Sequence, residues 1–177
     1  MENQSAVIAY FLSPEWLIAL SLIAYFLIRK PLHILFGALN VKKDLVNGII
    51  IFLQLLAISI ALDFVSRALG VNDTQSVNSA AQTIFAQGIW GAGNLIFNAF
   101  AEEVFFRGIL FSILGSIPTI LLFGLAHAGY GSIIELLGAL AAGFILIRAR
   151  EQNKSIFPGF IGHALYNLVV VFILRPF

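Results

Sequence analysis

The sequence predicts an all-α fold: a polytopic transmembrane helical bundle of about six helices, with a short fourth helix and no soluble domain. Of the 177 residues, 60% are hydrophobic and only 11% are charged, whereas soluble domains carry about 25% charged residues. The mean hydropathy of +0.97 points the same way. Long apolar runs also alternate with short charged or turn-forming segments, as expected for membrane-crossing helices. We therefore expect one integral membrane domain over residues 1–177.

The breaks between apolar runs set the expected helices. Pro14 suits a first helical position, and Arg29-Lys30-Pro31 ends the run that follows it. Gly115-Ser116-Ile117-Pro118 predicts a tight turn before the fourth helix, which is too short to cross a bilayer because crossing takes about 20 residues. After a tail over residues 1–13, we expect helices at 14–28, 45–69, 91–114, 118–128, 132–147 and 156–174.

The stretch between the second and third helices allows two interpretations. Residues 70–82 are polar and form the main predicted loop. From the later part of this stretch onward, apolar residues recur with a helical period at Val77, Ala80, Ala81, Ile84, Phe85 and Gly88. This period fits an amphipathic helix lying on the membrane surface. It fits equally well the first turns of a long third helix.

The basic residues predict how the bundle is oriented. One group follows the first helix (Arg29, Lys30, Lys42 and Lys43), and another follows the fifth (Arg148, Arg150 and Lys154). The opposite side carries only Arg67 and Arg175. Because Lys and Arg favour cytoplasmic loops, we expect both chain termini outside and both basic loops in the cytoplasm.

Composition also excludes several classes of function. The chain has no Cys, which excludes disulfides, thiolate catalysis and Cys-based metal sites. Its basic residues form no stripe with interleaved aromatics, so nucleic-acid binding is not expected. We also expect no signal peptide, because Glu2 stands where a signal peptide would be basic and no cleavage site follows.

The most informative stretch is EEVFFR at residues 102–107, because it places three charges inside an apolar run. Each charge at the centre of a membrane helix costs about 2.5–3.5 kcal/mol. Glu103 and Arg107 are four apart, hence about 40° from each other on a helix, and should form an ion pair. Glu102 and Arg107 diverge by about 140°. Glu102 therefore points to another element and is the candidate general base.

Two further polar motifs lie in later apolar helices. FGLAH at residues 123–127 ends with His127, and HALYN at residues 163–167 places His163 and Asn167 on one helix face. A rise of about 1.5 Å per residue puts Glu102, His127, His163 and Asn167 at similar depth. Such a group suits amide hydrolysis. A carboxylate and an imidazole would activate water, while a second imidazole and a carboxamide would hold the oxyanion.

These three motifs, in this order and on separate helices, resemble the CAAX protease and bacteriocin-processing (CPBP) family, which includes the type II CAAX prenyl endopeptidases. That family's pattern is EExxxR, FxxxH and HxxxN, and the resemblance covers about residues 100–170. It implies a glutamate-dependent intramembrane endopeptidase in a prokaryotic cell membrane, with catalytic helices over residues 91–174 and no metal or cofactor. The substrate would be a membrane-anchored or hydrophobic peptide.

The resemblance also implies residue roles. Glu102 would be the general base, with His127 helping to activate the water. His163 and Asn167 would form the oxyanion site. Arg107 would orient the two carboxylates, and Glu103 would act mainly as its structural partner.

Two other functions remain open from the sequence. A zinc protease could use Glu102, His127 and His163 as three ligands with water as the fourth, although no HExxH helix supports it. A non-enzymatic immunity factor or scaffold could use the same polar cluster for packing or binding.

Overall fold

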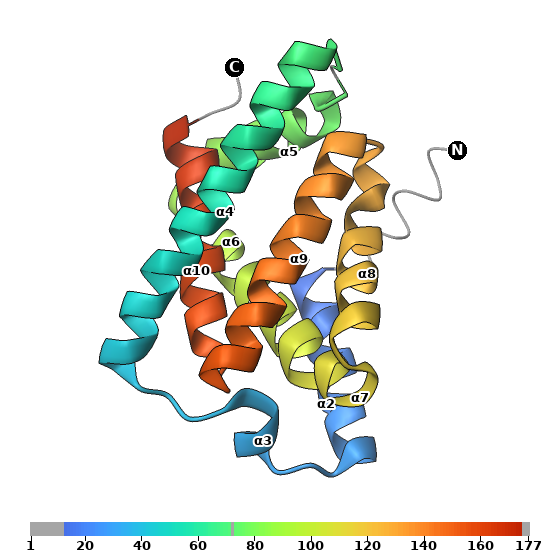
Figure 1. Cartoon of the computed structure of the whole chain (residues 1–177), viewed down its shortest axis with the longest axis vertical. Helices are drawn as coiled ribbons and strands as arrows, with labels where there is room; N and C mark the ends of the chain where they lie inside the picture. Colours follow the sequence, from blue (N-terminus) through green and yellow to red (C-terminus); the bar gives the residue numbers. More distant parts are fainter. Residues whose placement is uncertain (1–12, 72, 175–177) are drawn as a thin grey trace.

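The computed structural model describes residues 13–71 and 73–174. Across these two ranges the chain consists of helices and short connections, with no strand (Figure 1), which confirms the predicted all-helical class. The predicted tail, except Ser13, and Arg175 lie outside the described residues.

The first helices have clear sequence signals at their ends. Helix α2 spans Pro14–Ile28, as predicted, and ends at Arg29 in a left-handed conformation. A short helix, α3 (Leu32–Phe36), leads to α4 (Val41–Leu69). The prediction that the second helix begins at residue 45 is wrong, because Asn40 caps it. The Asn40 side chain accepts from the Lys43 N–H, and Asp44 accepts from the Asn40 N–H.

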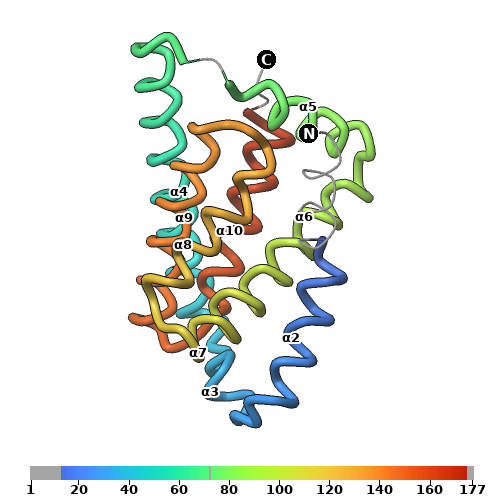
Figure 2. Tube along the Cα trace, turned by 90° about the vertical axis from the view of Figure 1, so that its right-hand side faces the viewer, coloured from blue at the N-terminus to red at the C-terminus, as the bar shows by residue number. Residues whose placement is uncertain are grey.

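The segment after α4 forms a helix of its own, α5 (Gln75–Ala86), and is not the start of the next helix. Its position on a membrane surface stays a prediction. Gly88, which has a positive φ of 58°, separates α5 from the next helical run. That run comprises α6 (Ile89–Glu102), the π-helix η1 (Glu103–Leu110) and α7 (Phe111–Leu114). Figure 2 shows it descending obliquely beside α2, which packs against α6 and η1.

The last three helical runs pass up, down and up through the bundle (Figure 1). They are α8 (Ser116–His127), α9 (Ile133–Asn153), and α10 (Phe157–Val169) with its π-helical end η3 (Val170–Leu174). A 3₁₀ turn, η2 (Ala128–Tyr130), joins α8 to α9. The predicted end of the fifth helix at residue 147 is wrong. The helix continues for six more residues, so Arg148 and Arg150 lie within it.

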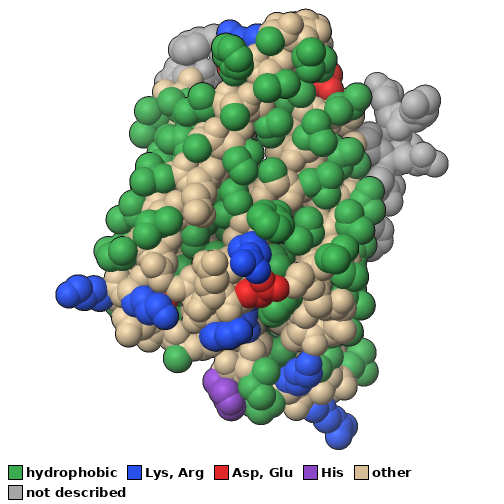
Figure 3. Space-filling model, in the orientation of Figure 1, with side chains coloured by type: hydrophobic (Ala, Val, Ile, Leu, Met, Phe, Trp, Pro, Cys, Tyr) green, Lys and Arg blue, Asp and Glu red, His purple; other side chains and the backbone are tan. Residues whose placement is uncertain are grey.

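At the basic end of the molecule, Arg150 connects α9 to α3 and η1 through hydrogen bonds. Its guanidinium donates to the carbonyls of Ile34 and Leu35 in α3 and of Arg107 in η1. The α3 segment is thereby held against the end of η1. The described Lys and Arg side chains on the face in Figure 3 lie mostly at this end, while hydrophobic side chains cover the rest.

The most extensive interface in the described chain joins α4 and α10, and small residues permit it. A Cβ added at Gly162 would lie 2.7 Å from Ile51 Cγ2 and 2.8 Å from the Gly48 carbonyl oxygen. Both distances are shorter than van der Waals contact. The close approach of these helices fixes the position of His163, the next residue along α10.

Two helical stretches among the described residues are long and apolar enough to cross a membrane: Leu32–Leu69 and Phe157–Leu174. Only 17% and 33% of their most apolar windows are buried inside the protein. The core helix of a soluble protein would be mostly buried, so these stretches present apolar surface outward.

We expect Gly162→Ala to destabilise the protein by about 1–3 kcal/mol, because the new methyl group overpacks the α4–α10 interface. Thermal unfolding in detergent micelles measures this change. Gly93→Ala on α6 is the matched control, since an added Cβ there meets nothing within 4 Å. Equal stability of the two variants would contradict the packing argument.

Candidate active site

Glu102, the last residue of α6, is nearly buried, with 9% of its surface exposed. Its Oε1 accepts a hydrogen bond of 3.1 Å from Asn98 Nδ2, one turn earlier on the same helix. Its Oε2 lies 3.8 Å from His163 Nε2, which is beyond hydrogen-bond distance. Oε2 is buried and has no hydrogen-bond partner among the described residues. One oxygen of this carboxylate is therefore held, and the other is available.

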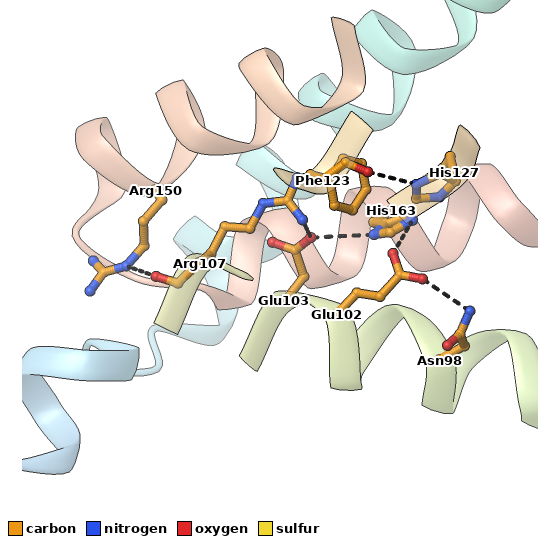
Figure 4. Close-up of polar contacts among 8 residues, drawn as sticks. All are labelled: Asn98, Glu102, Glu103, Arg107, Phe123, His127, Arg150 and His163. Carbon is orange, nitrogen blue, oxygen red and sulfur yellow. Dashed lines mark hydrogen bonds and ion pairs between the residues drawn. The ribbon is translucent and has the colours of Figure 1, made fainter. Parts of the chain in front are cut away.

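Glu103 and Arg107 form the ion pair that their spacing predicts. Arg107 Nη1 lies 3.1 Å from Glu103 Oε1, and both residues are fully buried (Figure 4). No guanidinium nitrogen of Arg107 makes a well-aligned hydrogen bond within the described chain, so the attraction to Glu103 is mainly coulombic. The guanidinium also lies 4.1 Å from the centre of the Phe123 ring. This cation–π contact adds to the compensation of the buried charge.

His163 lies between the two glutamates. Its Nδ1 is 3.3 Å from Glu103 Oε1, and its Nε2 faces Glu102 (Figure 4). Because a carboxylate can only accept, Nδ1 carries the proton that is shared with Glu103. The imidazole is thus oriented by Glu103 and presents Nε2 toward Glu102.

His127 is oriented by the backbone of its own helix. Its Nδ1 lies 2.9 Å from the carbonyl oxygen of Phe123. A carbonyl cannot donate, so Nδ1 bears the hydrogen and Nε2 is left as an acceptor. The rings of His127 and His163 lie 4.8 Å and 6.3 Å from the Phe123 ring, centre to centre. Phe123 therefore contacts both imidazoles.

Asn167 lies one turn beyond His163 on α10 and is half-buried. Its side chain makes no hydrogen bond or ion pair with the rest of the described chain. Of the four residues predicted to converge, Glu102 and His163 approach each other directly, and His127 joins them through Phe123. Asn167 has no polar contact to this group.

Asn98 is the site residue that the sequence analysis missed. A signal was present, since an amide four residues before a buried glutamate lies on the same helix face.

The structure also tests whether the residues named in the zinc interpretation are grouped as metal ligands. Within the described residues, no three His, Cys, Asp or Glu side chains are grouped so that they could hold a metal ion. Glu102, His127 and His163 therefore do not form the ligand set that it needs.

Fold and site together define an all-helical protein with a cluster of two glutamates and two histidines from three helical runs, in which Glu102, Glu103 and His163 are buried and His127 is half-buried. Residues 84–169 match the family model described as type II CAAX prenyl endopeptidase Rce1-like, and this stretch contains all three motifs. This match supports placing the chain in the CAAX protease family, a membrane-embedded family named for endopeptidases. No curated protein and no solved structure matches the chain significantly.

We expect Glu103→Gln to lower the free energy of unfolding by about 3–5 kcal/mol, because it leaves the Arg107 charge buried without a counter-charge. Denaturant titration in mixed micelles measures this loss. The double variant Glu103→Gln/Arg107→Met should recover much of it, since no unpaired charge remains.

Asp63→Asn is the matched control for this prediction. Its partner Arg67 is also four residues away, but the two side chains are 61% and 80% exposed. An exposed pair contributes about 0–1 kcal/mol. A loss in Glu103→Gln no larger than that in Asp63→Asn would contradict the role assigned to the buried pair.

Proposed function

We propose that this protein is a glutamate-dependent intramembrane endopeptidase in which Glu102 is the general base. The observation that carries the proposal is the unpartnered, buried Glu102 Oε2 beside His163 Nε2. A buried acceptor without a partner costs about 1–3 kcal/mol. Its position between a held carboxylate oxygen and an imidazole suits a proton acceptor for a bound water.

The bundle as a whole is proposed to span a membrane as one domain, with residues 91–174 forming its catalytic part. Large apolar side chains are exposed at many described positions, among them Phe26, Phe64 and Trp90. Such a surface would drive aggregation in water but is suited to lipid. The basic residues at the α3 end of Figure 3 favour that end as the cytoplasmic side. The proposed setting is a prokaryotic cell membrane.

Peptide-bond hydrolysis would proceed by attack of water on the scissile carbonyl carbon. Glu102 Oε2 takes a proton from the water while the water oxygen bonds to that carbon. His127 assists as an acceptor through Nε2, because its Nδ1 is committed to the Phe123 carbonyl. The C–N bond then breaks, and the proton held by Glu102 passes to the leaving amine.

The oxyanion formed in this step is assigned to His163 and Asn167. The geometry sets a condition on His163. Because Nδ1 already donates to Glu103, the ring can donate to an oxyanion from Nε2 only when both nitrogens are protonated. Asn167 can donate from its side-chain amide, which has no other partner in the described chain.

The proposed mechanism needs no metal. The proposed substrate is a membrane-anchored or hydrophobic peptide. The family name adds prenylated CAAX-type peptides as candidates to test.

We expect Glu102→Gln to reduce turnover by about 10²–10⁴-fold, the usual contribution of a general base. The assay uses proteoliposomes and a fluorescence-quenched CAAX-type peptide, with and without a farnesyl group. The thermal midpoint of the variant is measured in parallel. Cleavage of only the farnesylated peptide would identify the lipid as part of the recognised substrate.

Glu15→Gln is the matched control, because Glu15 is an exposed carboxylate in the first turn of α2. Its turnover should equal that of the unmodified protein. Full turnover in Glu102→Gln would remove this carboxylate from the mechanism.

We also expect turnover to persist after incubation with EDTA and 1,10-phenanthroline, because the proposed base and acceptor groups act without a metal. Inductively coupled plasma mass spectrometry of the purified protein should find no stoichiometric zinc. Loss of turnover on chelation, restored by zinc, would favour the zinc protease instead.

A further inference from the structure

Asn98 lies one helical turn before Glu102 on α6 and belongs to none of the three motifs. Its Nδ2 donates to Glu102 Oε1 over 3.1 Å (Figure 4). The amide nitrogen, rather than its oxygen, must face Glu102, because a carboxylate only accepts hydrogen bonds. This contact occupies one of the two carboxylate oxygens.

Packing alone does not account for an amide at this position. Asn98 Oδ1 is buried and has no hydrogen-bond partner among the described residues. Burial of an unsatisfied acceptor costs about 1–3 kcal/mol. A leucine would fill a similar volume in an apolar helix without burying that acceptor. The contact to Glu102 is therefore the feature that distinguishes asparagine here.

The backbone makes this contact well defined. Residues 98–102 are regular α-helix, and the π-helix begins only at Glu103. The side chains of Asn98 and Glu102, four residues apart, therefore lie one above the other. The wider turns of the π-helix then carry Glu103 toward Arg107 and His163, whereas Glu102 stays in register with Asn98.

Resting on the proposed hydrolytic function, we propose that Asn98 is a positioning residue for the general base. Its Nδ2–H group holds Glu102 Oε1, so that Oε2 is the atom that accepts the proton from water. In the step itself an O–H bond of water breaks, the proton moves to Oε2, and the electron pair forms the bond to the carbonyl carbon. Asn98 neither gains nor loses a proton.

The kinetic test compares Asn98→Leu and Asn98→Ala with the unmodified protein, using the quenched peptide in proteoliposomes. We expect kcat to fall by about 10- to 100-fold, because a hydrogen bond to a charged group is lost. KM should stay within about twofold, since Asn98 acts on the base and not on substrate binding. Asn78→Leu is the matched control: Asn78 is a half-buried amide on α5, outside the site.

An activity-independent test uses infrared difference spectra. Subtracting the spectrum of Glu102→Gln isolates the carboxyl band of Glu102. The same subtraction in the Asn98→Leu background should give a shifted band, while the Asn78→Leu background should give an unshifted one. An unshifted band in Asn98→Leu would show that the contact does not act on Glu102, and would overturn the inference.

The two proposals fail in different ways. Turnover lost in Glu102→Gln but unchanged in both Asn98 variants overturns the role of Asn98 alone. Full turnover in Glu102→Gln overturns the general base and, with it, its positioning residue. A kcat loss in Asn98→Leu with a lowered thermal midpoint and an unshifted band would indicate a folding defect and also overturn the inference.

Discussion

The site depends on the interactions that compensate the buried guanidinium charge of Arg107. A fully buried charge is stable only where other groups compensate it, and here the first two motifs supply them while the third is linked through Glu103. Glu103 supplies the counter-charge, the Phe123 ring lies against the guanidinium, and Glu103 also binds His163. Compensating this one charge therefore brings η1, α8 and α10 together. The same contacts leave His163 facing Glu102 and His127 against the Phe123 ring.

The π-helix explains how two adjacent glutamates take different roles. A π-helix has wider turns than an α-helix, and single π-segments are frequent at functional sites. Here the change of helix type falls between Glu102 and Glu103. Glu102 stays in register with the α-helical turn before it, while Glu103 belongs to the turn that carries Arg107. Glu103 is thus committed to a buried ion pair, while the unpaired oxygen of Glu102 faces His163.

The sequence predicted these features where a local pattern determines them. Spacing alone predicted the pair of Glu103 and Arg107, and Pro14 and Arg29 marked both ends of α2. The extent of α9 was missed because its last turns are polar, which apolar runs do not reveal. They are held by tertiary contacts such as those of Arg150 with α3. Which side chains meet was harder to predict. Asn167 was expected at the same depth as the other three residues, yet it makes no polar contact with them, because depth along a helix does not determine how the helix is rotated about its axis.

The contrast between the two glutamates supports a functional interpretation of the cluster. If the polar groups served only packing, burial would favour satisfying all of them, as unpaired buried acceptors are costly. Both carboxylates depart from that condition, because Glu103 Oε2 and Glu102 Oε2 are each buried without a hydrogen-bond partner among the described residues. The Oε1 of Glu103, however, is approached by both Arg107 and His163. Glu102 differs in its neighbours: a neutral amide, Asn98, satisfies one oxygen, and the unpaired oxygen faces an imidazole at 3.8 Å. A site that holds one carboxylate oxygen and leaves the other open is arranged to receive a ligand with a proton to donate, and water is the smallest such ligand.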